Sequence, residues 1–371
     1  MRFPEFTEEW KETKLGKIAE ITKGSGISKD RLSEYGSPCI LYGELYTKYK
    51  SEIINEVYSR TELDSSLLVK SKANDVIIPC SGETAIDIST ARCVPFNNIL
   101  LGGDLNIIRL KNNDGGFFAY QLNGTRKKDI ARVAQGVSVV HLYGENLKHI
   151  RVYHPAIEEQ KKITRLLSLI DKRIATQNKI IEDLKLLKSA IRKKVFVSLK
   201  EEHTESCEIN QLLTYEQPTA YIVTNDEYST DTTLIPVLTA NKGFVLGYTD
   251  EDFSIYQKGE CIIFDDFTMD AKYVSFPFKV KSSAIKILTA KPNVNLRFMF
   301  EYLSYLELKS EEHKRHYISE IASLVVELPS KEMQNKIASL MTSLDNKLAL
   351  EENTKVKYED EKQYQLSQMF I

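Results

Sequence analysis

Five segments in the N-terminal part of the chain combine glycine with side chains that form hydrogen bonds. Glycine lets the backbone approach a ligand closely, and Ser, Thr, Glu, Gln and Tyr side chains bond to base edges or to phosphates. Taken alone, each segment would be interpreted as an ordinary turn. Five such segments in one region that lacks a set of catalytic residues favour a binding surface. The segments are KGSGISKD (23–30), ILYGELYTKY (40–49), IPCSGETAIDIS (78–89), LGGDLNIIRL (101–110) and AQGVSVVHLYGENLK (134–148).

The sequence lacks the motifs of the common enzyme classes. It contains no GxxxxGK[ST] phosphate loop, no GxGxxG after a strand, no HExxH and no GxSxG. The Asn-Pro-Pro-aromatic and Asp-Pro-Pro-aromatic motifs of amino-methylating DNA methyltransferases are also absent. We therefore expect a protein that binds but does not catalyse.

Cysteine and histidine usage argues against a metal site. The 6 histidines show no spacing typical of metal ligands, and the 5 cysteines include no CxxC pair. We expect free, buried thiols, which are typical of a reducing compartment and indicate the cytoplasm. No apolar run reaches the roughly 18 residues that a membrane span needs.

A 21-residue stretch occurs twice in the chain, 174 positions apart, as Pro155–Ala175 and Pro329–Ala349. Eight positions are identical, whereas chance gives about one. Each copy opens with a proline three residues before a glutamate, which is a helix start signal. The duplication indicates that one large unit, a globular part followed by a helix, is used twice.

Both repeats continue a heptad pattern of apolar residues. The first run has no Gly or Pro up to about Lys200, which predicts a helix of about 40 residues that suits a coiled coil. Two helices with matching seams most simply pack on each other, although periodicity does not settle their orientation. The later part of the second run is polar, so its end should fray or need a partner. The predicted seam consists of Ile163, Leu167, Ile170, Ile174, Ile181, Leu184 and Ile191 in the first helix and Ile337, Met341, Leu344 and Leu348 in the second.

The regions before each helix show strand and turn signals, with one helical stretch each. Strand-like runs are Cys39–Tyr42, Val76–Ile78, Ile99–Leu101, Leu105–Leu110 and Ile150–Tyr153, then Leu234–Leu238, Gly259–Phe264 and Ala284–Leu288. The helical stretches run from Gly116 to about Ala134 and from Leu296 to about Lys309. We predict an α+β fold with domains at 1–154 and 201–328, alternating with helices at 155–200 and 329–371.

The net charge of −2 hides an uneven distribution. Residues 155–200 carry 12 Lys and Arg against 5 Asp and Glu, whereas residues 201–328 carry 11 against 21. A basic helix is either a phosphate-facing surface or an ordinary solvated face, and charge alone leaves both open. For the acidic second region, attraction to phosphates must come from the basic helix and partner subunits or from a local basic patch. The candidates are Lys242, Lys272, Lys279, Lys281, Lys314 and Arg315.

Over nearly its whole length the chain resembles the specificity subunit of type I restriction-modification systems. The stretches CILYGELYTKY, IPCSGETAIDIS, LGGDLNI and QGVSVVHLY are similar to motifs of one class of target-recognition domain, and Pro155–Ala175 is similar to the family's conserved helical region. In that family two target-recognition domains alternate with two helices that form an antiparallel coiled coil.

The resemblance implies a non-catalytic subunit that recognises a bipartite target in double-stranded DNA, each globular domain contacting one half. It implies two modification (methyltransferase) subunits as partners, which bring S-adenosylmethionine, while this chain carries no cofactor. Restriction (motor-nuclease) subunits are further partners that it implies. The paired helices would set the spacing between the half-sites, since B-DNA repeats about every 34 Å.

This interpretation predicts which side chains contact DNA. Glu44 or Glu83 would accept a hydrogen bond from a cytosine amino group. The predicted base contacts are Tyr42, Glu44, Ser81, Glu83, Thr84, Gln135, Ser138 and His141 in the first domain and Asn241, Lys242, Asp265, Asp266 and Thr268 in the second. The predicted phosphate contacts are Lys23, Lys29, Arg126, Lys127, Lys128 and Arg132. For each residue, a role in a turn or a helix cap is the alternative.

Two other functions remain open from the sequence. One is a self-contained DNA methyltransferase or nuclease, against which the missing motifs argue. The other is a coiled-coil scaffold that binds protein without sequence-specific DNA binding. Duplication of a domain and a helix fits both a DNA-recognition subunit and a scaffold, so only the loop motifs separate these two.

Overall fold

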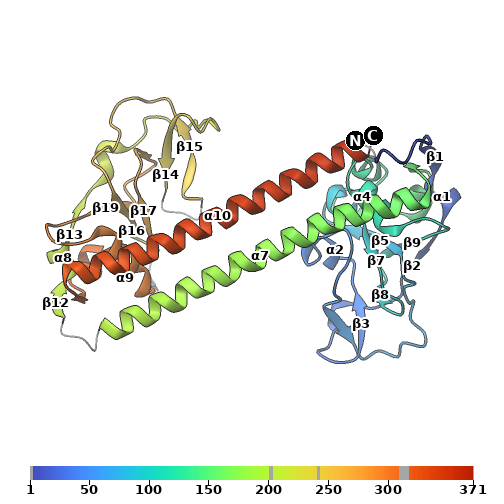
Figure 1. Ribbon diagram of the computed structural model, residues 1–371, viewed down its shortest axis with the longest axis horizontal. Coiled ribbons are helices and arrows are strands. Elements are labelled where there is room, and N and C mark those ends of the chain that lie inside the picture. The colour runs from blue at the N-terminus through green and yellow to red at the C-terminus, as the bar shows by residue number, and fades with distance from the viewer. Residues whose placement is uncertain (1–2, 200–203, 240–242, 309–316, 371) are drawn as a thin grey trace. The chain divides into compact units, whose positions relative to one another are not determined.

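The computed structural model describes residues 3–199, 204–239, 243–308 and 317–370. The chain forms two compact units. Unit 1 is Met1–Lys179 with Asn353–Ile371, and unit 2 is Ile180–Glu352. Each unit contains one globular domain and a segment of each of the two long helices (Figure 1). The compact units thus divide both long helices, whereas the division at 154, 200 and 328 remains a prediction from sequence.

The domain of unit 1 is built on a four-stranded antiparallel sheet in the order β2-β9-β5-β7. A three-stranded sheet β4-β3-β8 and the pairs β1-β11 and β6-β10 complete it. Its strands are β1 (Lys11–Lys14), β2 (Ala19–Lys23), β3 (Ser37–Ile40), β4 (Ser59–Thr61), β5 (Asp75–Pro79), β6 (Ser81–Gly82), β7 (Arg92–Val94), β8 (Leu100–Leu101), β9 (Leu105–Leu110), β10 (Val140–His141) and β11 (Arg151–His154). Its short helices are α1 (Leu15–Ile18), α2 (Glu44–Thr47), α3 (Ala85–Ile88), α4 (Gly115–Asn123), α5 (Lys127–Arg132) and α6 (Gly144–Lys148), with a 3-10 turn at Lys29–Arg31.

The domain of unit 2 repeats the four-stranded sheet, the three-stranded sheet and the terminal strand pair of unit 1. Its four-stranded sheet has the order β13-β19-β16-β17, its three-stranded sheet the order β15-β14-β18, and β12 pairs with β20. Its strands are β12 (Glu205–Glu208), β13 (Leu213–Glu216), β14 (Ile235–Leu238), β15 (Val245–Thr249), β16 (Cys261–Asp265), β17 (Ala271–Val274), β18 (Lys279–Val280), β19 (Ile285–Ala290) and β20 (Val325–Leu328). The helical segments before α10 are α8 (Ile209–Leu212), a 3-10 turn (Pro218–Tyr221), α9 (Leu296–Tyr305) and a π-helical turn (Tyr317–Ile321).

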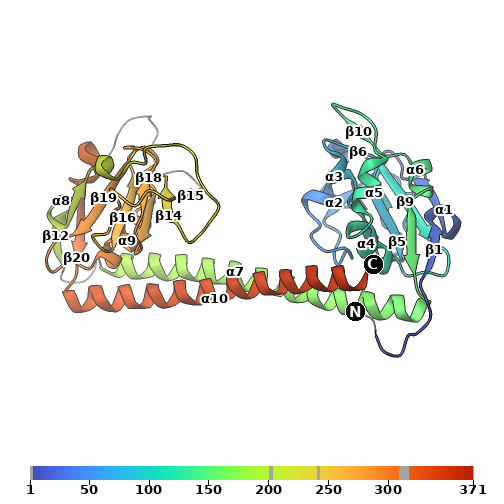
Figure 2. The ribbon, with the colours of Figure 1, turned by 90° about the horizontal axis from the view of Figure 1, so that it is seen from above.

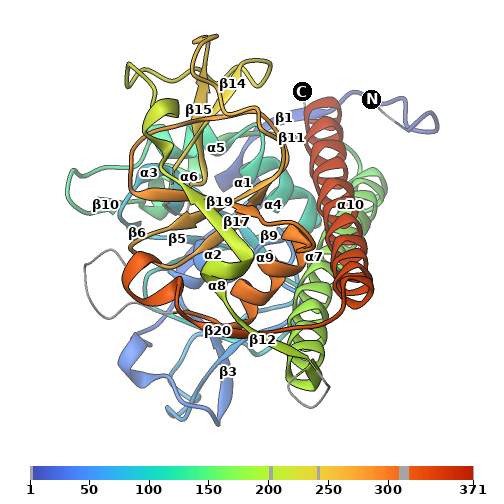
Figure 3. The same ribbon diagram turned by 90° about the vertical axis from the view of Figure 1, so that its left-hand side faces the viewer.

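The two domains agree in strand register as well as in strand order. Ile77 pairs with Ile107 in unit 1, and Ile263 pairs with Ile287 in unit 2. Figure 3 shows unit 2 from the side, with α9 next to α7 and α10. The prediction of two similar α+β domains, each followed by a long helix, is therefore confirmed.

The long helices are α7 (Ile157–Leu199) and α10 (Lys331–Met369), close to the predicted ranges. The repeated glutamine fixes the start of each helix in the same way. Gln160 Oε1 accepts from the Asp114 amide at 2.9 Å, and Gln334 Oε1 accepts from the Asn295 amide at 2.9 Å. Asp114 and Asn295 are themselves the N-caps of α4 and α9. This role explains why the glutamine occurs in both copies of the repeat.

Within each unit the two helix segments run antiparallel. In unit 1, Asp171 pairs with Lys362, and the Arg173 guanidinium lies over the Tyr358 ring. In unit 2, Lys185 pairs with Glu352 and Lys188 with Asp345. Partners on α10 therefore fall in number as those on α7 rise. Figure 1 and Figure 2 both show α10 lying along α7 in each unit.

The predicted seam is buried against the domains as well as between the helices. In unit 1, Ile163 and Leu167 share a buried cluster with Met369 and Phe370 at the end of α10. In unit 2, Ile337 and Met341 share a cluster with α7 and α9 residues. Ile170 and Ile181 are buried, whereas Ile174, Leu184, Ile191, Leu344 and Leu348 are half-buried. The partner that the polar tail of α10 needs is thus the domain of unit 1.

One predicted helix is in fact two. The stretch predicted from Gly116 to Ala134 forms α4 and α5, which are separated at Gly124. Gly124 has φ −85° and ψ −106°, a backbone conformation that does not continue a helix.

Candidate nucleic-acid interface

Three of the five glycine-containing segments meet at one cleft of about 730 Å³ in unit 1. Its walls come from the loops that follow β2, β3 and β8. The loops approach closely because Gly24 has no side chain: a Cβ there would lie 1.9 Å from the carbonyl oxygen of Gly102. The polar and aromatic lining residues are Ser28, Lys29, Tyr42, Glu44, Tyr46, Thr47, Lys48 and Asp104.

Glu44 lies at the floor of this cleft and is only 6% exposed. Its carboxylate accepts from the Leu41 amide at 3.0 Å, from the Ser59 hydroxyl and from Lys48 Nζ at 2.6 Å. These bonds hold the turn that presents Tyr42, whose side chain is exposed. The expectation that Glu44 contacts a base is not supported, because its oxygens are occupied within the fold.

The other two segments pair with each other next to the cleft. His141 in β10 lies opposite Ser81 in β6, and Val140 lies opposite Gly82. Ser81 Oγ donates to the Asp104 carboxylate at 3.2 Å, which connects β6 to the cleft. In unit 1, β6 and β10 lie on the side of the domain that faces away from α7 and α10 (Figure 2). All five segments are therefore brought to one region.

The turn between β6 and α3 presents Glu83 beside two tyrosines. Glu83 is exposed. Burial raises the pKa of Tyr46, and the neighbouring Tyr42, Asp87 and Glu83 raise it further, so these groups lie close together. Tyr46 was missed in the sequence, although it follows Tyr42 by four residues on a helical turn.

Thr84 has the alternative, structural role. It is the N-cap of α3, and its hydroxyl oxygen accepts from the Asp87 amide at 3.1 Å. Its hydroxyl group also lies 2.6 Å from the Asp87 carboxylate and donates to it. The residue is exposed, but both of its hydrogen-bonding functions are used to start the helix.

A short hairpin arm, Gln135–His141, projects from the domain, and the strand β10 at its end pairs with β6. The Gln135 amide donates to the His141 carbonyl at 2.9 Å, and the His141 amide donates back at 2.7 Å. The side chains of Gln135, Ser138 and His141 are exposed, as a base-contacting role requires. The His141 ring stacks on Tyr143 with 6.2 Å between centroids. The arm and its base thus present several hydrogen-bonding groups next to an aromatic pair.

The predicted phosphate contacts fall into two groups. Lys29 lines the cleft, and Lys23 Nζ lies 6.0 Å from the centroid of the Tyr143 ring at the base of the arm. The others lie at the start and along the length of α5. There Arg132 pairs with Asp129 at 3.1 Å, and Lys128 is exposed.

Two basic residues at the start of α5 are turned toward the protein. Burial lowers the pKa of Lys127, whose Nζ lies 3.5 Å from the Thr90 hydroxyl. Arg126 pairs with Asp129 at 3.3 Å, and its guanidinium lies over the Tyr153 ring. Lys127 and Arg126 therefore have partners within the fold, which does not support the expected phosphate contacts.

In unit 2, two predicted base contacts are buried. Asp265 is 4% exposed, and its carboxylate accepts from the Phe267 and Thr268 amides at 2.8 and 3.2 Å. Asp266 is 1% exposed and pairs with the buried Lys286 at 3.4 Å. These carboxylates shape a turn and neutralise a buried cation, so base contact is not supported for either. Thr268 is exposed.

The predicted basic residues of unit 2 also divide into buried and exposed side chains. Lys279 is fully buried and pairs with Glu251 at 2.6 Å, so it is no part of a basic surface. Lys272 and Lys281 are exposed. The amide of Lys281 bonds to the carbonyl of Leu238 just as the amide of Gly102 bonds to that of Ile40. Lys281 thus has the place in unit 2 that a glycine of the cleft has in unit 1. Asn241, Lys242, Lys314 and Arg315 lie outside the described residues.

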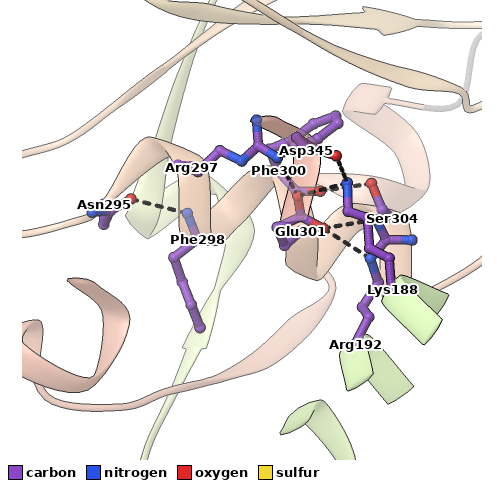
Figure 4. A network of polar contacts seen from close by, with 9 residues as sticks. All are labelled: Lys188, Arg192, Asn295, Arg297, Phe298, Phe300, Glu301, Ser304 and Asp345. Carbon is purple, nitrogen blue, oxygen red and sulfur yellow. Dashed lines mark hydrogen bonds and ion pairs between the residues drawn. The ribbon is translucent and has the colours of Figure 1, made fainter. Parts of the chain in front are cut away.

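A network of charged groups joins the helices to α9 in unit 2 (Figure 4). Glu301 is fully buried, and Arg192, Arg297 and Lys188 surround its carboxylate. Lys188 and Arg297 also pair with Asp345. Unit 1 has the counterpart, in which Asp171 pairs with Lys362 at 2.7 Å and accepts from the Tyr120 hydroxyl at 2.6 Å.

All 5 cysteines are free, and burial raises the pKa of Cys39 and of Cys80 to about 11, so both are protonated near neutral pH. Among the described residues no group of three or more His, Cys, Asp or Glu side chains is placed to hold a metal ion. Within the same part of the chain, no helix is both long and apolar enough to cross a membrane.

The fold and the site define a chain with two related α+β domains, each attached to a long helix, and a polar, aromatic surface on the first. The chain belongs to the family described as type I restriction modification DNA specificity domain, whose model matches residues 7–186 and 201–359. The resemblance inferred from the sequence is thereby confirmed.

Individual relatives agree with this family. The chain is 39% identical over 142 residues to the EcoR124I/EcoR124II specificity subunit of Escherichia coli, covering 37% of this chain and 35% of that protein. It is 25% identical over 296 residues to the putative MjaX specificity subunit of Methanocaldococcus jannaschii, covering 71% and 69%. The match to the Escherichia coli subunit thus spans about a third of that protein.

A solved structure extends the likeness of fold to the whole chain. The S subunit of a type-I restriction-modification system from M. genitalium covers 100% of this chain and 97% of its own, with a TM-score of 0.70 and 15% sequence identity. The alternative of a scaffold that binds only protein has no support in these comparisons.

Proposed function

We propose that this chain is the DNA sequence-recognition subunit of a type I restriction-modification complex, in which each globular domain contacts one half of a bipartite target. The observation that carries the proposal is the convergence of five separated segments on one region of unit 1. There Tyr42, Tyr46 and Glu83 lie beside the base of the hairpin arm. Exposed aromatic rings and hydrogen-bonding side chains next to Lys23 and Lys29 suit base edges flanked by phosphates.

The two domains differ where they would contact DNA, which suits an asymmetric target. In unit 1 the strand β5 ends at Pro79 and is followed by Cys80 and Ser81-Gly82, whereas in unit 2 the equivalent strand β16 ends at the buried Asp265 and is followed by the buried Asp266. Of the predicted DNA contacts, the proposal keeps those with exposed side chains whose polar groups do not cap a helix. They are Tyr42, Glu83, Gln135, Ser138, His141, Lys23, Lys29, Lys128, Arg132 and Thr268, with Lys281 kept from the predicted basic patch of unit 2.

The long helices would set the spacing between the half-sites and dock two modification subunits. Those subunits would bring S-adenosylmethionine and the methyltransferase site, and restriction subunits would add cleavage of unmodified DNA. This chain would supply positioning alone. Its antiparallel helices are suited to that task because ion pairs join them to each domain, Lys362 to Glu52 in unit 1 and Arg192 to Glu301 in unit 2.

The test is a genome-wide map of methylated sites in cells with this gene, without it, and with the Glu83→Gln variant. The wild-type chain should direct methylation to one bipartite sequence, and deletion should remove it. Glu83→Gln should alter the preferred base at one position of one half-site and leave the other half-site unchanged. Retention of the same methylated sequence after deletion would refute the proposed function.

A further inference from the structure

The tip of the hairpin arm exposes apolar side chains. Val137 is 97% exposed and Val139 is 52% exposed, whereas Val140 and Leu142, which follow on the same segment, are 8% and 1% exposed. The buried pair belongs to the core of unit 1. The arm therefore points one set of apolar residues into the fold and leaves another set in solvent.

The backbone fixes this outward arrangement. The paired hydrogen bonds between Gln135 and His141 close the arm, and Leu142 donates to the Cys80 carbonyl at 2.7 Å beyond it. Gly136 has φ +119°, and a Cβ there would lie 2.1 Å from the Val139 carbonyl oxygen, so only glycine fits. The arm is thus a preformed shape whose tip residue is held away from the core.

The surroundings of the tip are polar and cationic. Ser138 separates the two valines, Gln135 and His141 flank them, and Lys23 with Tyr143 lies at the base. In a DNA major groove, the C5-methyl of thymine is the apolar group among donors and acceptors. Side chains that wedge between base steps are the larger Phe, Leu, Ile, Met and Pro. Valine fits contact with a methyl group better than insertion into a base stack.

We propose that Val137, at the tip of the arm, recognises the C5-methyl of a thymine in the half-site that unit 1 contacts. The inference rests on the proposed function and goes beyond it by naming one base and the atom that is recognised. Val139, two residues further on, widens the apolar contact. Gln135, Ser138 and His141 supply the hydrogen bonds that orient the arm in the groove.

The test uses the full chain assembled with its modification subunits and the target found by methylation mapping. Each thymine of the first half-site is replaced in turn by deoxyuridine, which removes only the methyl group. At one position the replacement should weaken binding of the wild-type complex about fourfold, the value of one buried methyl group. Val137→Ala should weaken binding to the thymine target and abolish the difference between thymine and deoxyuridine there.

Val325→Ala is the matched control, since Val325 is 63% exposed on β20 of unit 2; it should keep the full difference. A first half-site without thymine, or equal binding of every deoxyuridine target, overturns the inference while the proposed function stands. Loss of subunit assembly by Val137→Ala in the absence of DNA also overturns it, because the arm would then contact protein. Absence of any sequence-dependent binding by the wild-type complex refutes the proposed function, and the inference with it.

Discussion

At the scale of single residues, unit 2 buries a lysine where unit 1 has a leucine. Lys279 and Leu100 occupy the same position in the strands β18 and β8, and both are fully buried. Lys279 Nζ pairs with Glu251 at 2.6 Å and donates to the Phe253 carbonyl at 2.9 Å. The ion pair therefore replaces an apolar contact in the core of the second domain.

This pair gives unit 2 a defined pH dependence. Burial alone would raise the pKa of Glu251, but bonds from Lys279 and Thr224 outweigh it and lower the pKa to about 2 from its ordinary 4.5. A carboxyl group with a depressed pKa stabilises the folded state above pH 4.5 and loses that contribution as the pH falls toward 2. Glu251→Gln should destabilise unit 2 by about 3 kcal/mol at pH 7, because it leaves a buried cation unpaired.

Hydrogen exchange of the β14 and β18 amides, compared between variant and wild type at each pH, measures this effect. Protection should fall sharply at pH 7, and the difference should shrink as the pH falls toward 2, where about half of the wild-type carboxyl groups are protonated. Glu227→Gln, at an exposed position, should behave as wild type at both pH values. A difference of equal size at both pH values would show that the carboxylate charge is not the cause.

Which side chains belong to the site could be predicted only in part. Residue type and glycine spacing selected loops that the fold brings to one region, where Tyr42, Glu83 and His141 are exposed. The buried carboxylates Glu44 and Asp266 lie in sequence segments of similar composition. The sequence therefore could not distinguish them from the exposed candidates. Their burial depends on which strands pair beneath them, and pairing over tens of residues leaves no local signal in the sequence.

At the scale of elements, two symmetric ion pairs join α7 and α10. The repeat spacing of 174 residues relates Asp171 to Asp345 and Lys188 to Lys362. Each aspartate of one copy pairs with the lysine of the other, as Asp171–Lys362 in unit 1 and Asp345–Lys188 in unit 2. The duplicated sequence thus forms the reciprocal contacts that two identical chains make in an isologous dimer.

Heptad spacing predicted both helices because their apolar seam is continuous in the sequence. The same pattern could not show that the ends of the seam are buried against the domains. Met369 and Phe370 share the buried cluster of unit 1 with Ile163, which lies more than 200 positions earlier in the sequence. Gly124, which separates α4 from α5, was present in the sequence, but a single glycine inside a helical pattern is often tolerated.

The ion pair in unit 1 should show strong coupling. Lys362 Nζ lies 2.7 Å from both Asp171 and Glu52, and all three side chains are at least 88% buried. Burial and the charge of Glu52 raise the pKa of Asp171, as expected when two carboxylates share one ammonium group. Lys362→Met should therefore cost about 3–5 kcal/mol, because it leaves both carboxylates buried without a cation.

The measurement is urea unfolding followed by fluorescence of Trp10, the single tryptophan, which packs against Phe117 and Phe370 in unit 1. Asp171→Asn should cost less than Lys362→Met, since Lys362 keeps Glu52. Adding Asp171→Asn to Lys362→Met should recover part of the loss. The exposed Lys357→Met on α10 should stay within about 0.5 kcal/mol of wild type. Strict additivity of the two substitutions would mean that the charges do not act on each other.

At the scale of the whole molecule, the formal charge of −2 says little about binding to DNA. The location of the cations is more informative. Unit 2 buries Lys279 and Lys286 in ion pairs and places Arg297 in the network around Glu301. Unit 1 keeps Lys23 and Lys29 exposed beside its cleft. The first domain is therefore expected to supply the larger share of the electrostatic attraction to phosphate.

Salt dependence tests this asymmetry in the assembled complex. Each phosphate contact that is lost should reduce the slope of log affinity against log salt by about 0.9. Lys29→Gln should lower the slope and the affinity for all sequences alike, because a phosphate contact carries no base information. Lys281→Gln should do the same if the equivalent loop of unit 2 also meets the backbone.

The matched control is Lys72→Gln, since Lys72 is exposed and precedes β5 at the end of the strand away from β6. Its slope should equal that of wild type, because the proposed interface lies at the other end of β5. If Lys72→Gln changes the slope while Lys29→Gln does not, DNA approaches the opposite end of the domain. In that case the cleft and the hairpin arm would not face the duplex, and the glycine-containing segments would need another ligand.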